Sequence, residues 1–191
     1  MALARPPQPV KLIAGLLAAS HNLLDEAREA LERHYGTIDA CSVPAVWKAS
    51  RYYDDEMGPD IVRQFVSFTA LIDPGRIAAI KAETNELENV WRQDAKRAVN
   101  IDPGYVSLTK LVLATTKDAA HRIYLADGIY AEPTLRYESG AFRAYAHTYP
   151  DYADDAGLAF FGSVRESYVE QSRATAGEKS RKPPMNADER R

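Results

Sequence analysis

Two stretches that alternate polar with apolar residues, 121–125 and 129–136, restrict the fold of this chain more than any other feature. Alternation with a period of two is typical of a β-strand that buries one face. The residues between them, Ala126-Asp127-Gly128, end on a glycine, which can adopt the left-handed conformation that tight hairpins need. The sequence therefore predicts an antiparallel hairpin with a three-residue loop.

This hairpin predicts which side chains face one another across the two strands. The expected pairs are Leu125 with Ile129, Tyr124 with Tyr130, and Arg122 with Glu132. An apolar face, expected in the core, holds Ile123, Leu125, Ile129, Ala131 and Leu135. Alternation sends His121 to this face, as either a core or a functional histidine. The polar face holds Arg122, Tyr124, Tyr130, Glu132, Thr134 and Arg136. It is either a ligand-binding face or a solvated surface whose Arg122–Glu132 pair contributes only ~0.2–1 kcal/mol.

The remaining segments predict an α+β fold. The near-continuous apolar run 10–18 is typical of a strand covered on both faces. Helical spacing predicts amphipathic helices that begin at Asn22 and at Asp73-Pro74, with strands at 38–47 and 63–72. Strand, helix, strand, strand, helix, strand is the order of a ferredoxin-like βαββαβ core. C-terminal antiparallel hairpins extend this core with strands near 105–116, 120–126, 129–137 and 141–147, followed by a final helix over about 156–174.

Composition limits the class of protein. With 191 residues, 46% of them hydrophobic, the chain can pack one domain, expected over 9–174 between a flexible start, 1–8, and a disordered tail, 175–191. The net charge is −3, and residues 171–191 hold six Lys and Arg against three Asp and Glu, so the domain itself is more acidic. That balance makes nucleic-acid binding unexpected. No apolar run approaches the ~20 residues of a membrane span, so we expect no membrane association and a cytoplasmic location.

The segment Asn100–Tyr105 contains Asp-Pro-Gly, which can turn backbone N–H groups toward an anion. Asp102 would then touch the ligand, with Lys110 and Lys117 as partners for a phosphate or carboxylate. The alternative is an Asx turn without a ligand. The second Asp-Pro-Gly, at 73–75, is explained by helix capping alone.

Two further segments carry charged side chains. The connection 52–60 is rich in tyrosines and carboxylates, and is either a solvated loop or a lid in which Glu56 faces the ligand. It lacks the spacing of a calcium-binding loop, so no metal site is predicted. On the second helix, Lys81, Asn85 and Glu88 follow at steps of four and three and form one stripe. That stripe is either part of a site or an exposed network worth a few tenths of a kcal/mol.

Several of these motifs resemble domain-of-unknown-function family 4416 of bacteria and archaea. The matching positions are 9–12, 52–53, 56–58, Lys81 with Thr84, Asn85 and Glu88, 100–105, 110–117, 121–125, 128–132 and 148–152. The resemblance covers roughly residues 9–170 and implies no established reaction, although some relatives are labelled as GTP-binding. The chain has neither a G-x-x-x-x-G-K-[ST] loop nor a G-x-G-x-x-G turn, so no motif supports that label.

The sequence favours a protein that binds a small anionic ligand, a nucleotide or a phosphorylated metabolite, on the polar sheet face. An enzyme would use acid–base or phosphoryl-type chemistry, with its acid or base among Glu132, Glu56 and Asp102. The residues expected to bind the ligand are Lys81, Asn85, Glu88, Lys110, Lys117, His121, Arg122, Tyr124 and Tyr130. The alternative is a non-catalytic interaction module that uses the same Tyr and Arg surface. Neither a cofactor nor an oligomeric state is predicted.

Topology adds one sharper expectation. In a ferredoxin-like core, a crossing loop and the end of a strand can meet beside an extension of the sheet. Six charged residues should therefore converge on one concavity: Glu56, Glu88, Asp102, Lys117, Arg122 and Glu132.

Overall fold

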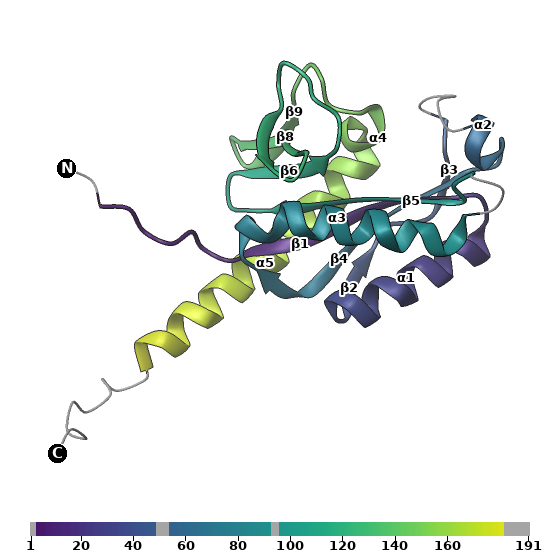
Figure 1. Ribbon diagram of the computed structural model, residues 1–191. Helices are drawn as coiled ribbons and strands as arrows, with labels where there is room; N and C mark the ends of the chain where they lie inside the picture. Colours follow the sequence, from purple (N-terminus) through teal and green to yellow (C-terminus); the bar gives the residue numbers. More distant parts are fainter. Residues whose placement is uncertain (1–2, 49–53, 93–95, 182–191) are drawn as a thin grey trace.

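A computed structural model describes residues 3–48, 54–92 and 96–181 and confirms the α+β class (Figure 1). The strands are β1 Val10–Ala18, β2 Ile38–Cys41, β3 Ala45–Val46, β4 Val62–Ile72, β5 Val99–Val106, β6 Lys110–Thr115, β7 Ile123–Ala126, β8 Ile129–Glu138 and β9 Ala141–Ala144. The helices are α1 His21–Tyr35, α2 Asp54–Met57, α3 Ile77–Glu88, α4 Pro150–Ala153 and α5 Asp155–Arg181, with short 3₁₀ turns η1 Pro74–Arg76 and η2 Asn89–Trp91. None of the helices in these described ranges is long and apolar enough to cross a membrane.

All the strands belong to one antiparallel sheet. Its order is β2-β4-β1-β5-β6-β8-β7, with β3 beside β4 and β9 beside β8. In Figure 1 the strands β6, β8 and β9 stand with α4 apart from the layer formed by β1, β2 and β4. The sheet therefore has two parts, which meet at β5 and β6.

Helices cover both faces of the sheet at β1, where every residue of the strand is buried. Leu12 and Leu16 pack on one face with residues of α1 and α3. Ile13 packs on the other face with Tyr152 of α4 and Phe161 of α5. The structure thus confirms that the apolar run 10–18 forms a strand with two buried faces.

Polar side chains cap the start of α1 and of η1, the 3₁₀ turn that leads into α3. Ser20, rather than Asn22, caps α1, because its side-chain oxygen accepts a hydrogen bond from the backbone N–H of Leu23. The helix ends at Gly36, whose φ of 88° is in the left-handed region. Asp73 accepts from the N–H of Gly75, which confirms its predicted role as a cap.

The β7–β8 hairpin forms, but its turn is shorter than predicted. Asp127 and Gly128 make a two-residue turn in which both φ angles are positive, 52° and 75°, as in a type I′ turn. Ala126 closes β7 and pairs with Ile129, where Leu125 was the expected partner. A bulge at Leu125 accounts for the shift.

The pairing of Tyr124 with Tyr130 is confirmed, but the expected apolar face of β7 is not buried. Ile123 is 62% exposed and Leu125 is 39% exposed. The reason is topological, because β7 ends the strand order and so lacks a neighbouring strand on one side.

A second bulge, at Thr134 of β8, changes which face the strand presents. Ile129 packs in the core beside α1 and α3, whereas Leu135 packs in the core beside α5. Their even spacing predicts a common face, and the extra residue places them on opposite faces. Thr134, predicted on the polar face, is fully buried for the same reason.

The segment 100–105 lies inside β5, so the predicted anion-binding turn is wrong. All of β5 pairs with β1 in regular register, which outweighs the local turn preference of Asp-Pro-Gly.

Near the other end of the chain, α5 continues past residue 174 to Arg181. Whether the domain needs the residues after 174 stays a prediction, and 1–2 and 182–191 lie outside the described residues.

Candidate functional site

The candidate site lies where β5 and β6 separate. The two strands pair only from Gly104 to Val106, opposite Leu113 to Leu111. Before Gly104, β5 remains with β1, whereas beyond Leu113 β6 remains with β8. Pro103 stands at the point of separation and has no N–H with which to continue the ladder. The sheet therefore divides into two branches at this residue.

Side chains of α3 satisfy the open edge that this division leaves on β5. The backbone N–H of Ile101 donates to Glu88 Oε1 at 2.8 Å, and its carbonyl oxygen accepts from Lys81 Nζ at 2.7 Å. Both α3 residues are buried. Because an open strand edge exposes unpaired backbone groups, Lys81 and Glu88 stabilise the fold here whatever else they bind.

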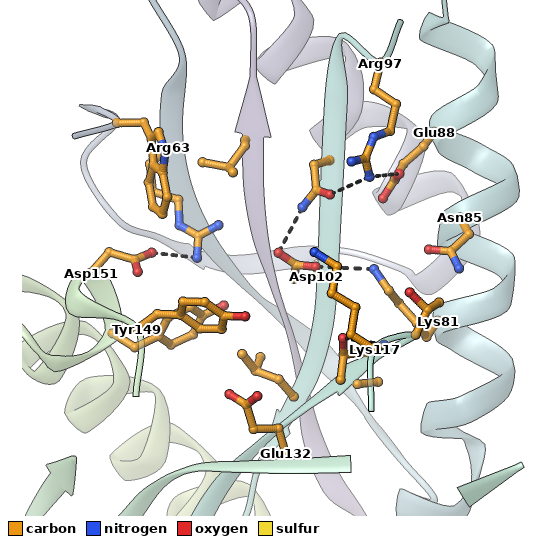
Figure 2. Close-up of a pocket in the computed structure, with 18 of the residues that line it drawn as sticks. Arg63, Lys81, Asn85, Glu88, Arg97, Asp102, Lys117, Glu132, Tyr149 and Asp151 are labelled. Carbon is orange, nitrogen blue, oxygen red and sulfur yellow. Dashed lines mark hydrogen bonds and ion pairs between the residues drawn. The ribbon is translucent and has the colours of Figure 1, made fainter. Parts of the chain in front are cut away.

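A cavity of about 610 Å³ lies between the two branches of the sheet (Figure 2). Its wall includes residues of α2, β4, α3, β5, β6, β8 and α4. The predicted convergence is present, since the cavity is lined by Glu56, Glu88, Asp102, Lys117, Arg122 and Glu132. Lys81 and Asn85, from the predicted stripe on α3, line it too.

Four other predicted residues do not line this cavity. Lys110 is exposed at the far end of β6, and Tyr124 is 59% exposed with its ring against Tyr130 at a centroid distance of 5.4 Å. His121 lies just behind the wall, where its ring stacks on His147 with centroids 3.9 Å apart. Tyr124, Tyr130 and Lys110 thus lie away from the cavity, although the sequence grouped them with its ligand-binding residues.

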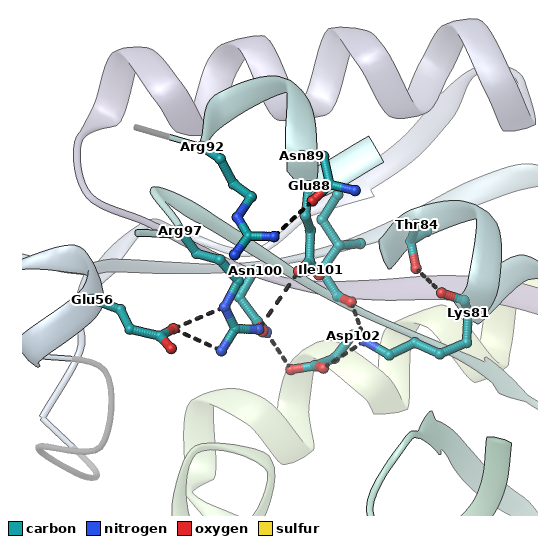
Figure 3. Close-up of polar contacts among 10 residues, drawn as sticks. All are labelled: Glu56, Lys81, Thr84, Glu88, Asn89, Arg92, Arg97, Asn100, Ile101 and Asp102. Carbon is teal, nitrogen blue, oxygen red and sulfur yellow. Dashed lines mark hydrogen bonds and ion pairs between the residues drawn. The ribbon is translucent and has the colours of Figure 1, made fainter. Parts of the chain in front are cut away.

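A chain of polar contacts runs along β5 from α2 to α3 (Figure 3). Arg97 donates through Nε to Glu56 Oε2 at 2.8 Å and through an Nη to Asn100 Oδ1 at 3.1 Å. Asn100 donates to Asp102 Oδ2 at 2.9 Å, and Lys81 Nζ lies 3.3 Å from Asp102 Oδ1. These contacts fix the side chains of this wall before any ligand arrives.

The opposite wall is organised around Glu132, which is 1% exposed. Its Oε2 accepts from Arg122 Nε at 2.7 Å and lies 3.3 Å from His121 Nε2. Arg122 also donates to the carbonyl oxygen of Lys117 at 2.9 Å and to the hydroxyl of Tyr149 at 3.3 Å. Arg122 therefore positions the loop after β6 as well as the buried carboxylate.

Sequence reasoning missed a further charged pair, Arg63 with Asp151. Their side chains meet at 2.7 Å, and both line the cavity. The guanidinium also lies over the rings of Trp47 and Tyr152, at 5.5 and 5.1 Å. Gly15 leaves room for this group and for the Tyr152 hydroxyl, because a Cβ there would stand 3.0 Å from Arg63 Nη2 and 2.5 Å from that hydroxyl. Asp151 belongs to the motif 148–152, which could have identified it. Arg63 lies in an apolar run, and no sequence pattern there indicates a functional residue.

Burial raises the pKa of two carboxyl groups that line the cavity, Glu88 and Asp151. Desolvation raises the pKa of Glu88 above its ordinary value, although Lys81 and the Ile101 N–H oppose the shift. Desolvation also raises the pKa of Asp151, against the opposing charge of Arg63. Both groups therefore hold a proton to higher pH than an exposed carboxyl does.

Within the described residues, no group of three or more His, Cys, Asp or Glu side chains is arranged to hold a metal ion. The charged residues of the cavity instead meet as ion pairs of opposite sign. The arrangement can donate and accept hydrogen bonds on several sides of a small molecule.

Comparison with known proteins gives one match. The family described as Domain of unknown function (DUF4416) matches residues 8–168, well over half of the chain. No curated protein and no solved structure matches significantly.

Proposed function

The chain belongs to the DUF4416 family, and because that family has no assigned function, we propose one from the cavity itself. We propose that the cavity binds a small polar metabolite that carries an anionic group, either a phosphate or a carboxylate. A phosphorylated metabolite, including a nucleotide, fits this description.

The balance of charge around the cavity supports an anionic group. The chain carries a net charge of −3, yet the lining has more basic than acidic side chains, the basic ones being Arg63, Lys81, Arg92, Arg97, Lys117 and Arg122. A partly enclosed cavity screens charge less than bulk water does, so even a small excess attracts an anion.

The burial and the hydrogen bonds of the Lys81 ammonium group are the observation that supports the proposal most strongly. Its ammonium group has three N–H donors, and two of them bond to the Ile101 carbonyl oxygen and to Asp102. The side chain is only 7% exposed and lines the cavity. A buried donor needs an acceptor, and an oxygen of a bound phosphate or carboxylate would supply it.

The test is a thermal-shift panel on the full chain with inorganic phosphate, nucleoside monophosphates, sugar phosphates and dicarboxylates. A compound at ~100-fold excess over its Kd should add ~2.7 kcal/mol to the free energy of unfolding. Lys117→Gln should lose most of that stabilisation, because Lys117 lines the cavity.

Lys110→Gln is the matched control, since Lys110 begins the same strand that Lys117 follows but lies outside the cavity. It should keep the full shift. A panel in which no compound raises the melting temperature, or in which both variants lose the shift equally, would argue against the proposal.

Acid–base chemistry on the bound molecule is a further part of the proposal, and Glu132 is favoured over Glu56 and Asp102 for it. Glu56 is 43% exposed and paired with Arg97, and both oxygens of Asp102 have partners. Glu132 is buried beside the partly exposed His121, which offers a proton a path to solvent.

A second candidate function, a protein-interaction module, is favoured by the hairpin alone. Ile123 and Tyr124 present 62% and 59% of their surface on a strand at the end of the sheet. Exposed apolar side chains on an edge strand can pair with a partner chain.

We also propose that the first half of the sheet is a ferredoxin-like core. The order β2-β4-β1-β5, with α1 between β1 and β2 and α3 between β4 and β5, supports this description. It gives the cavity a rigid wall, because β5 and α3 both belong to that core.

A further inference from the structure

The wall of the cavity opposite Lys81 contains a buried acceptor without a partner. Among the described residues, few buried side-chain atoms lack a hydrogen-bond partner, and Glu132 Oε1 is one of them. Buried carboxylate oxygens are almost always bonded, so an exception on the wall of a cavity points to a bound molecule.

The other oxygen of the same carboxylate shows why Glu132 is oriented as it is. Arg122 Nε and His121 Nε2 both meet Oε2, which fixes the plane of the group. In Figure 2 the carboxylate of Glu132 points from β8 into the cavity, toward the side that holds Tyr149 and Asp151. Oε1 is therefore held in place for an incoming group.

A second carboxylate on this wall makes it rich in acceptors. Asp151 uses Oδ2 for its ion pair with Arg63, and its Oδ1 is buried without a hydrogen bond. A fully ionised phosphate or carboxylate cannot satisfy either free oxygen, because it brings no proton to donate. These two oxygens thus require a donor on the bound molecule, whereas Lys81 requires an acceptor.

We propose that the bound metabolite carries a hydrogen-bond donor, a hydroxyl or a protonated amine, that Glu132 Oε1 accepts. The inference rests on the proposed function, because the anionic group would place the donor across the cavity. The substrate class is then a hydroxylated or amino-substituted phosphate or carboxylate rather than a bare anion.

Three small phosphate monoesters test the inference by thermal shift of the full chain: methyl phosphate, glycerol 3-phosphate and O-phosphoethanolamine. Methyl phosphate has the anionic group without a hydroxyl or amine donor. A hydrogen bond to a charged acceptor should make a donor-bearing probe bind about tenfold more tightly than methyl phosphate. The tighter of the two donor-bearing probes identifies the donor as a hydroxyl or as an amine.

Glu132→Gln should remove that preference, because Arg122 holds the amide oxygen and the amide NH₂ then faces the ligand. Binding of methyl phosphate should persist in this variant. Glu138→Gln, on the same strand but 58% exposed, is the matched control and should keep the preference. Far-UV circular dichroism checks that each variant is folded, and the comparison of probes on the unmodified protein needs no variant.

Equal binding of all three probes to the unmodified protein would overturn this inference and leave the proposed function standing. Retention of the tenfold preference in folded Glu132→Gln would also overturn it. Failure of every probe to bind would count against the proposed function itself.

Discussion

The cavity and the tip of the β7–β8 hairpin, residues 123–130, use polar and aromatic side chains in opposite ways. In the cavity, Glu132 and Lys81 are buried and held by hydrogen bonds from neighbouring elements, Glu132 by Arg122 and Lys81 by the carbonyl oxygen of Ile101 in β5. At the hairpin tip, Tyr124 and Ile123 are exposed and belong to one local turn. Burying charge costs free energy, whereas exposing single apolar side chains is normal. The cavity is therefore the stronger indication of a function.

The largest expected effect on stability is at Lys81, a buried residue of the cavity. Lys81→Met should lower the free energy of unfolding by about 2–3 kcal/mol, because it leaves the Ile101 carbonyl oxygen and the Asp102 carboxylate without their donor. Urea unfolding at neutral pH measures the change.

Lys110→Met serves as the control, because Lys110 is exposed. It should change the free energy of unfolding by about 0.5 kcal/mol or less. Similar losses in both variants would contradict the structural role assigned to Lys81.

The pH dependence of stability gives a smaller effect. Burial raises the pKa of Glu88 in the folded protein above the ordinary value of 4.5, so the folded state binds the proton more tightly than the unfolded state does. Its contribution is most favourable below pH 4.5 and is lost as the pH rises through the raised pKa. Relative to the unmodified protein, Glu88→Gln should therefore gain stability between pH 4.5 and 7.

Urea unfolding of both proteins at pH 4.5 and 7 tests this sign, with Glu138→Gln as an exposed control. Asp151 shifts in the same direction and stays in both proteins, so some pH dependence should remain. A Glu88→Gln variant that becomes relatively less stable over this range would contradict the burial argument.

The smallest effect is expected at the hairpin tip. Tyr124→Ser removes a ring contact with Tyr130 and should cost less than about 1 kcal/mol. It should leave ligand-induced thermal shifts unchanged, because Tyr124 lies outside the cavity. Loss of those shifts would move the binding site to the hairpin and favour the interaction-module function.

Sequence patterns located most of the strands and much of the site, because both depend on periodicity and chain order. The predicted strands 38–47 and 105–116 were wrong in extent, since the first divides into β2 and β3 and the second into the end of β5 and β6. The two bulges, at Leu125 and Thr134, were not predictable, since a bulge depends on the register of the partner strand. The bulge at Leu125 moved the partner of Ile129 to Ala126, and the bulge at Thr134 placed Leu135 on the opposite face from Ile129.

The second Asp-Pro-Gly shows how tertiary structure can override a local preference. In β5, Pro103 stands where the strands separate, and Gly104 allows close approach, since a Cβ there would stand 2.5 Å from the Val112 carbonyl oxygen. The same tripeptide caps a helix at 73–75. Only the neighbours of each copy distinguish a turn from a strand, and those neighbours are far away in the sequence.

Arg63 could not be recognised because a buried cation on an apolar strand has no periodic signal. Its partners, Asp151 and Tyr152, follow it by almost 90 residues along the chain. By contrast, Asp102 and Glu132 were identified because motifs surrounded them, although Asp102 reaches the cavity from a strand rather than from a turn.

Amide hydrogen exchange tests most directly whether the cavity, and not the hairpin, is the binding site. The measurement compares the full chain with and without the panel compound that gives the largest thermal shift. We predict slower exchange in 99–103 and 113–117, the segments that flank the cavity, and no change in 123–130. Protection confined to 123–130, with the segments around the cavity unaffected, would contradict the account.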